Sequence, residues 1–300
     1  MHKTTIVSLT AGFLSGLTTL YGAEILDRLQ PSALTSTCGR VSEVSFTSEV
    51  TTLKSGVLAF CSDGSMKMFE FPEPVWVIGY KTEVKDAQGE PPIENYLCHT
   101  FFGDHMPKEG DDSAMKSLYS DAFTREIRLP DGFGVPMKTG EKIHWMPMFN
   151  NRADRKAEVR MTFRVFLIRE RDRIKPIQPL YSTLRSVENP HLYFVPPGKH
   201  AKSTTFTLPF DGRIHFMGTH VHPYAESVEL IELTRGQTLW KSSPRRSVSG
   251  EFGAMETYSS AEGIPLRPGA RYALTATYNN PTDHWVDAMA GLFLFFTNSR

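Results

Sequence analysis

The sequence predicts an all-β protein of two tandem β-sandwiches, and three observations lead to this fold class. Short apolar or alternating runs recur along the chain, separated by Gly, Pro, Asn and Asp, as in strands joined by turns. Helical periodicity is weak everywhere, and one short helix is expected only within residues 112–123. A length of 300 residues is also typical of two domains of ordinary size.

The expected strands follow from the residue pattern of each segment. Residues 75–80 are almost wholly apolar, which favours a buried strand, and residues 159–165 alternate between apolar and polar side chains, which favours a half-buried one. Residues 227–233 and 238–240 flank a turn-forming segment and predict a hairpin, and residues 272–278 predict a further strand. Evenly spaced short strands of this kind are typical of β-sandwiches.

A domain boundary is expected between residues 169 and 189. This stretch contains the charged run 170–173 and the Pro-punctuated segment 175–179. The sequence therefore predicts one sandwich over residues 40–170 and a second over residues 187–300.

The charge balance narrows the classes of partner. Lys and Arg together number 33, as do Asp and Glu, so the formal net charge is zero. This argues against a nucleic acid or an anionic membrane surface recognised by charge. The sequence contains no nucleophile elbow, phosphate-binding glycine loop, zinc-finger spacing or EF-hand, so hydrolytic and nucleotide-dependent chemistry have little support.

A targeting segment is expected at the N-terminus. Lys3 precedes an uncharged run of apolar and small residues at positions 6–20, which is followed by Tyr21-Gly22-Ala23. The pattern indicates a signal peptide over residues 1–23 and export to the extracellular space or the periplasm. No membrane span is expected after cleavage, because no other apolar run is long enough. An uncleaved anchor or an ordinary buried segment is the alternative.

The chain has three cysteines, Cys38, Cys61 and Cys98. In an exported protein this odd number predicts one disulfide bridge and one free thiol. A free thiolate is a soft ligand that suits copper.

The strongest candidate site combines two histidines with a methionine. His220 and His222 are two residues apart in an expected strand, so both imidazoles project from one face. Met289 opens an apolar, aromatic run that predicts a buried strand. If the two strands are neighbours, two imidazoles and a thioether meet, a donor set that favours copper. Asp283 and Asp287 are candidates to orient the imidazoles. The alternative is an ordinary histidine pair with a core methionine.

The first half has its own candidates. Cys98 and His99 are adjacent, and His144 begins the segment His144-Trp145-Met146-Pro147-Met148. In an extended segment His144, Met146 and Met148 lie on one face. The alternative is that Pro147 ends the strand and that both methionines fill a core.

These motifs resemble a known family. Gly218-Thr219-His220-Val221-His222, followed by Asp287-Ala288-Met289, resembles the second catalytic domain of the copper type II, ascorbate-dependent monooxygenases, the family of peptidylglycine α-hydroxylating monooxygenase and dopamine β-monooxygenase. Residues 96–103 resemble the family's His-His strand, and residues 140–144 resemble the strand that carries its third histidine. The order and spacing of the motifs match over residues 40–300.

The resemblance implies two jelly-roll β-sandwiches that face each other across a cleft, with one copper on each. It implies that His220, His222 and Met289 hold the oxygen-activating copper. It also implies that His99 and His144 hold the electron-supplying copper.

Cys98 stands where the family has the remaining histidine of the electron-supplying site. It is then a thiolate ligand, a disulfide partner of Cys38 or Cys61, or the mark of a lost site.

The expected function is therefore a copper-dependent monooxygenase. It would hydroxylate a C–H bond of a small-molecule or peptide substrate with O2 and a one-electron donor such as ascorbate. One alternative is an exported copper-binding or carrier protein without hydroxylase activity, which the cysteine at position 98 favours. The other is a structural tandem sandwich in which the histidine pair is residual.

Overall fold

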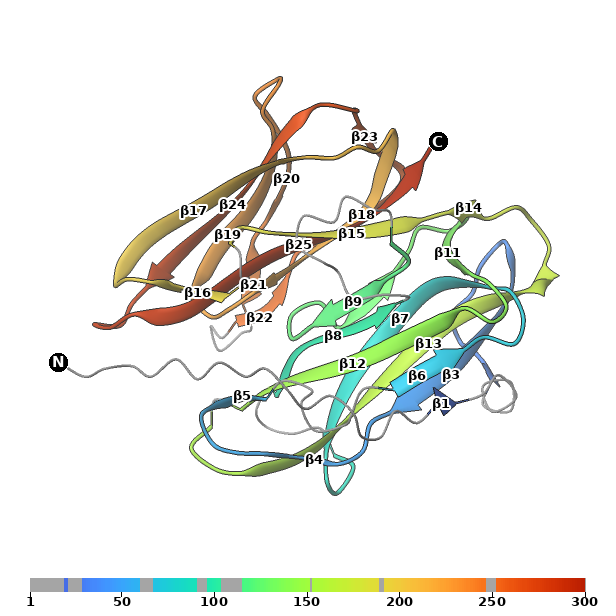
Figure 1. Ribbon diagram of the computed structural model, residues 1–300, viewed down its shortest axis with the longest axis horizontal. Coiled ribbons are helices and arrows are strands. Elements are labelled where there is room, and N and C mark those ends of the chain that lie inside the picture. Colours follow the sequence, from blue (N-terminus) through green and yellow to red (C-terminus); the bar gives the residue numbers. More distant parts are fainter. Residues whose placement is uncertain are drawn as a thin grey trace.

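The computed structural model describes most of the chain (Figure 1). The described residues are 19–20, 29–59, 67–90, 96–103, 115–151, 153–188, 192–246 and 252–299. The signal peptide expected over residues 1–23 therefore lies outside the described residues, except for Thr19 and Leu20. Cys61 also lies outside them.

The described chain is all-β, as the sequence predicts. In chain order the strands are β1 (Thr19–Leu20), β2 (Gln30–Pro31), β3 (Gly39–Thr47), β4 (Thr51–Leu53), β5 (Val57–Ala59), β6 (Lys67–Glu70), β7 (Val75–Asp86), β8 (Leu97–Gly103), β9 (Leu118–Asp121), β10 (Glu126–Arg128), β11 (Phe133–Met137), β12 (Lys142–Asn151), β13 (Ala157–Arg173), β14 (Gln178–Pro179), β15 (Tyr181–Ser186), β16 (Leu192–Val195), β17 (Gly198–Thr207), β18 (Gly212–Val221), β19 (Ala225–Glu232), β20 (Gln237–Ser242), β21 (Pro244–Arg246), β22 (Phe252–Met255), β23 (Tyr258–Leu266), β24 (Arg271–Asn280) and β25 (Val286–Asn298).

The first half forms a sandwich of two sheets. One sheet has the order β1-β6-β12-β8-β9, with β5 also on β12, and the other has the order β14-β11-β7-β13-β3-β2, with β10 and β4 at its sides. Apolar side chains of both sheets form one core, including Phe69, Phe102 and Trp145 from the first and Phe46 and Phe163 from the second. Successive strands cross between the sheets, as in a jelly roll.

The second half forms another sandwich. Its sheets have the orders β15-β25-β18-β23, with β16 also on β25, and β17-β24-β19-β20. The core between them contains Leu292 and Leu294 of β25 and Leu230 and Leu274 of the facing sheet. The first two sheets end at Pro179 and the next begin at Tyr181, so the division between the sandwiches falls inside the expected boundary segment.

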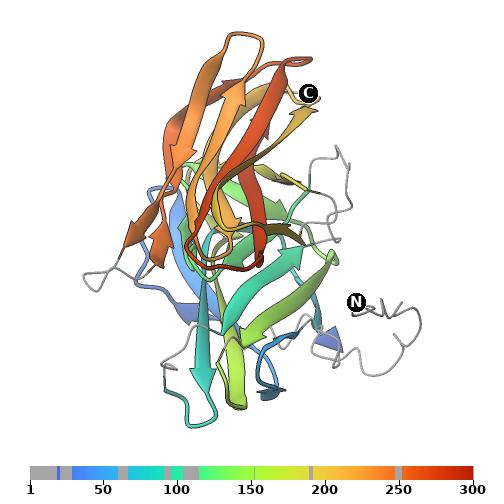
Figure 2. The same ribbon diagram turned by 90° about the vertical axis from the view of Figure 1, so that its left-hand side faces the viewer.

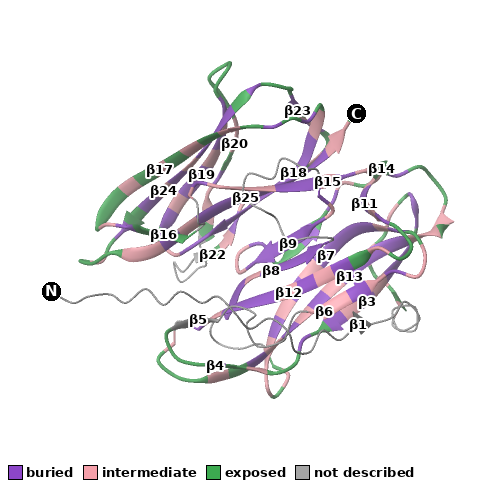
Figure 3. Ribbon diagram, viewed as in Figure 1, coloured by how far each residue is buried: buried purple, intermediate pink, exposed green. Residues whose placement is uncertain are grey.

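Strands β18 and β25 of the β15-β25-β18-β23 sheet are buried on both faces. One face packs on the second core, whereas Phe216, Phe293 and Phe295 on the other face belong to the core of the first sandwich. The Phe293 ring lies 5.1 Å from that of Tyr119 in β9. The two sandwiches thus lie directly against each other (Figure 2), and β18 and β25 are buried where they meet (Figure 3). The near-continuous apolar run of β25 follows from this double burial.

Two sequence-based expectations are wrong. Residues 112–123 were expected to contain a helix, but Leu118–Asp121 is strand β9, and no helix occurs among the described residues. Strand β9 pairs antiparallel with β8, so tertiary pairing overrides the local pattern. Because the described chain has no helix, it also has none that could cross a membrane.

The expected disulfide is also absent from the part of the chain that the structure describes. Cys38 and Cys98 are both buried free thiols. Cys38 lies in a small core with Ile78 and Ile168, and its sulfur lies 3.7 Å from the carbonyl oxygen of Pro176. The two thiols therefore belong to different environments, and Cys98 is available for another role.

A glycine on β18 allows the two sandwiches to dock, and this can be tested. A Cβ added to Gly218 would lie 2.2 Å from the Phe293 ring. We expect Gly218→Ala to lower the free energy of unfolding by about 1–3 kcal/mol, because overpacking displaces that ring. Gly291→Ala in β25 is the matched control, since its Cβ would meet nothing closer than 3.7 Å. Urea unfolding measures both, and equal losses would contradict this account of the interface.

Candidate metal centre

Strands β18 and β25 bring His220, His222 and Met289 to one sheet face. His220 pairs with Gly291 across the ladder, and Val221 pairs with Ala290. The N–H of His222, just past the end of β18, donates to the carbonyl oxygen of Met289 at 3.2 Å. Directly opposed residues share a face, so Met289 lies beside His222 in register. The expected neighbourhood of the two strands is confirmed.

A bulge in β8 points Cys98 and His99 in the same direction. Leu97 pairs with Phe149 and His99 pairs with the adjacent Met148. Cys98 therefore has no partner residue on β12 and is the extra residue of the bulge. Adjacent strand residues normally project to opposite faces, and a bulge re-aims them. The Cys98 sulfur lies 3.3 Å from Nδ1 of His99. Both side chains reach the second sandwich.

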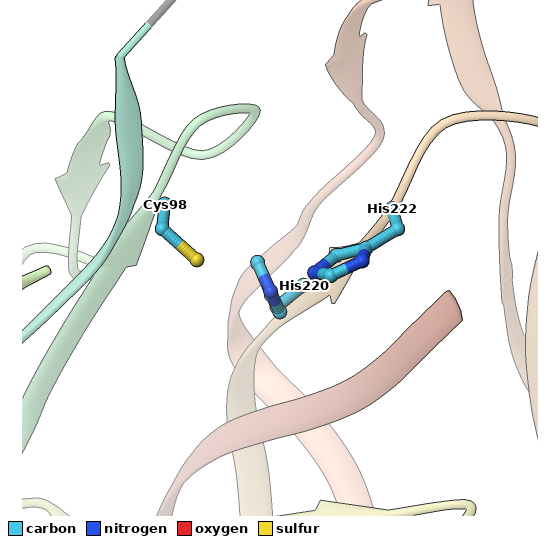
Figure 4. Close-up of side chains that lie close together, drawn as sticks. All are labelled: Cys98, His220 and His222. Carbon is cyan, nitrogen blue, oxygen red and sulfur yellow. The ribbon is translucent and has the colours of Figure 1, made fainter. Parts of the chain in front are cut away.

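Cys98, His220 and His222 form one cluster between the sandwiches. One ligand atom from each of the three lies within 4.8 Å of the others. Cys98 lies on β8, and His220 and His222 lie at and just past the end of β18; the three side chains come together between the sandwiches (Figure 4). The His220 ring lies 5.1 Å from that of His99 and 5.4 Å from that of His222. Cys98 is 3% exposed, His220 2% and His222 3%.

The cluster contains buried polar atoms without partners. Both ring nitrogens of His220 and Nε2 of His222 are buried and make no hydrogen bond. Buried polar groups are normally paired, because an unpaired one costs about 1–3 kcal/mol. A metal ion is a partner that accepts several such lone pairs together. The group Cys98–His220–His222 can therefore hold a metal ion.

One carboxylate fixes the tautomer of His222. Nδ1 of His222 lies 2.5 Å from Oδ2 of Asp287, so Nδ1 carries the proton that it donates. The lone pair of Nε2 then faces the cluster, as in carboxylate–histidine–metal arrangements. The expectation that Asp287 orients an imidazole agrees with this contact. Asp283 instead lies on the surface beside His284, with 3.0 Å between Oδ1 and Nδ1.

Two residues of the site are not singled out by the sequence. Asp121 ends β9 opposite His99 and is fully buried, and its Oδ2 lies 3.7 Å from Nδ1 of His220. Tyr119 in the same strand places its ring 5.5 Å from that of His99 and 6.3 Å from that of His220. Both residues lie within 112–123, where the sequence predicts a short helix, so no pattern of strand residues pointed to them.

The cluster also shifts the ionisation of its own members. Burial alone would raise the pKa of the Cys98 thiol, but the imidazoles of His99, His220 and His222 hold this pKa well below its usual value. Burial alone would lower the pKa of His220, but attraction from the nearby Asp121 carboxylate and the Cys98 thiolate raises it to about 9. In the metal-free chain these shifts favour a thiolate beside an imidazolium.

The structure does not bring His144 to the cluster. Strand β12 continues through Pro147. On one edge of β12, residues 142–145 pair with β6 and residues 149–151 pair with β5, and Pro147 lies in the gap between them. A proline is tolerated there because no neighbouring strand on that edge needs its N–H. His144, Met146 and Met148 share a face as predicted, but only Met148 is opposite His99. His144 is four residues further along β12, or about 13 Å. The expectation that His99 and His144 share one ion is therefore not met.

The arrangement differs from two separate copper sites across a cleft. The histidines expected for one site, His220 and His222, lie within ring contact of His99, which was expected for the other. The described donors thus form one compact centre. With one thiolate and two imidazoles it offers a set that binds soft and borderline transition metals.

Comparisons with known proteins identify no family. No family model and no curated protein matches the sequence. Among solved structures, the major capsid protein P2 of bacteriophage PM2 is similar with a TM-score of 0.36 and 8% identity, over 84% of this chain and 99% of that chain. N-glycanase F (PNGase F) is similar with a TM-score of 0.37 and 10% identity, over 85% of this chain and 96% of that chain. Similarities this low carry no information about function.

The raised pKa of His220 predicts a pH-dependent stability of the metal-free protein. The pKa of His220 is about 9 in the folded state and 6.5 as its ordinary value. Protonated His220 therefore stabilises the folded state fully below about pH 6.5. This stabilisation is lost as the pH rises through about 9. We expect the difference in unfolding free energy between wild type and His220→Gln to shrink over this range, by up to about 3 kcal/mol. Urea unfolding with a chelator present measures this difference in unfolding free energy at each pH. A difference that does not change with pH would contradict the attraction of protonated His220 to Asp121 and Cys98.

Proposed function

We propose that this protein binds one copper ion at Cys98, His220 and His222 and uses it in one-electron redox chemistry. The observation that carries the proposal is the buried group of one thiol and two imidazoles with unpartnered nitrogens. Its residues come from both sandwiches, so folding and docking assemble the site before any ion binds. Such preorganisation removes the cost of gathering the ligands.

Copper is favoured over zinc by the sulfur donors near the cluster. Met289 is opposite His222 in register, and Met148 is opposite His99. A trigonal group of two histidines and one cysteine with a weak thioether is the donor pattern of copper electron-transfer centres. Structural zinc sites instead complete four strong nitrogen or sulfur ligands. A one-electron donor such as ascorbate, of the kind that the sequence suggests, would suit this chemistry.

The protein residues would hold and insulate the ion. Asp287 would orient His222, and Nδ1 of His99 lies 3.3 Å from the Cys98 sulfur, where an N–H can donate to a thiolate. When bound, copper supplies reversible one-electron transfer. Burial of all three ligands would exclude water from the ion and limit reorganisation between its oxidation states.

A second candidate is the monooxygenase activity that the sequence suggests. The register of His220, His222 and Met289 favours it, because these are the ligands that the resemblance implies for oxygen activation. Hydroxylation needs access for a substrate as well as for O2, and the imidazoles of His220 and His222 are almost fully buried. A pocket of about 120 Å³ beside Cys38 is lined by none of them. We therefore rank electron transfer and copper binding first. Ascorbate-dependent O2 consumption coupled to a hydroxylated product would reverse this order.

Copper stoichiometry tests the proposed ligands. We expect one Cu(I) per chain in wild type, measured by competition with a chromophoric chelator, and none in Cys98→Ala or His222→Ala, because each removes a ligand. His144→Ala is the matched control and should retain the ion, since its side chain is about 13 Å along the strand from the site. Two ions in wild type, with one lost in His144→Ala, would restore the two-copper arrangement. No copper, or zinc in preference to it, would overturn the proposal.

A methionine pair tests the thioether. Met289→Leu conserves volume, so the unfolding free energy should change by less than about 1.5 kcal/mol. Cu(I) binding should weaken, because a soft donor beside His222 is removed. Met217→Leu in β18 is the control: Met217 is fully buried in the core on the other side of the sheet and should leave copper binding unchanged. An equal effect of the two substitutions would exclude a role for the Met289 sulfur.

A further inference from the structure

We infer that Asp121 is a positioning residue of the metal centre, whose carboxylate orients His220 as Asp287 orients His222. The inference rests on the proposed metal binding and extends it. Asp121 belongs to the first sandwich and His220 to the second, so this contact crosses the interface between them.

The Asp121 carboxylate is held in one orientation. Its Oδ1 accepts hydrogen bonds from the backbone N–H groups of Phe123 and Thr124, both at 2.7 Å. The residue is fully buried, and Oδ2 has no hydrogen-bond partner. Because the turn fixes Oδ1, the direction of Oδ2 is fixed as well. A buried carboxylate oxygen without a partner is costly and calls for one.

The nearest matching atom is Nδ1 of His220. It lies 3.7 Å from Oδ2, and it too is buried without a partner. Their separation leaves no room for a bridging water, since two hydrogen bonds of normal length and angle join groups about 4.5 Å apart. Closure by less than about 1 Å gives a charge-assisted hydrogen bond. Oδ2 of Asp121 and Nδ1 of His220 would therefore each gain the hydrogen-bond partner that it lacks.

This hydrogen bond would select the tautomer of His220. With the proton on Nδ1, the lone pair of Nε2 is left for the ion, as it is for His222 through Asp287. Both imidazoles would then bind through Nε2, each backed by a carboxylate. Docking of the sandwiches would set the geometry at His220, since Asp121 reaches it from the other side of the interface.

Asp121→Asn separates this role from a structural one. In this variant the amide oxygen can still accept from Phe123 and Thr124, so the turn is retained. The amide NH2 group then faces His220, which must accept at Nδ1 and carry its proton on Nε2, where the ion should bind. We expect Cu(I) affinity to fall about 10–100-fold. The metal-free variant should stay folded but lose some stability below about pH 9, because its neutral amide no longer attracts the protonated His220. Asp287→Asn should lower Cu(I) affinity by a comparable factor. Asp131→Asn is the control and should leave Cu(I) affinity unchanged, because the Asp131 carboxylate lies on the surface and accepts from Ser36 and Thr37.

A second measurement needs no variant. The Cu(I)-loaded wild type is diamagnetic, so ¹⁵N-histidine NMR should show exchange-protected Nδ1–H signals for both His220 and His222. A missing signal for His220, or wild-type affinity in Asp121→Asn, would overturn the role of Asp121 while copper binding by wild type stands. If wild type binds no copper, the proposed function fails, and this inference fails with it.

Discussion

The structure depends on one contact surface, the packing of the β15-β25-β18-β23 sheet against the first sandwich. Phe216, Phe293 and Phe295 of this sheet complete the core of the other domain. Strand β18 of this sheet carries His220 near its end, and β25 carries Met289, which is opposite His222. Apolar burial on this surface therefore determines how far Cys98 lies from the two imidazoles. The cluster of Cys98, His220 and His222 is a consequence of domain docking, and an ion bound there would in turn stabilise the docked state.

Much of the fold and half of the site could be predicted from local pattern. Alternation placed His220 and His222 on one face, and the apolar run of β25 indicated a buried strand. The other half depends on pairing between distant strands. The bulge at Cys98 exists only relative to β12, and Asp121 faces His220 only after the sandwiches dock. His144 was assigned to the site from motif order, which contains no information about strand register.

Cys98 changes the chemistry that the resemblance implies. A histidine there would give a centre made of imidazoles, whereas the thiol adds a strong, soft ligand to His220 and His222. The surrounding groups fit a thiolate: His99 lies at hydrogen-bond distance from its sulfur, and burial protects it from oxidants in solution. The same features that suit a closed electron-transfer centre make access for a substrate difficult. We therefore propose electron transfer ahead of oxygen chemistry as the role of a bound ion.

The most direct test of the account is X-ray absorption spectroscopy of the copper-loaded wild-type chain, with Cys98→Ser for comparison. The account predicts a single copper environment with one sulfur at short distance and two imidazole nitrogens, and loss of the short sulfur shell in Cys98→Ser. A spectrum with nitrogen and oxygen ligands alone, or one that Cys98→Ser leaves unchanged, would contradict the claim that both sandwiches hold one ion.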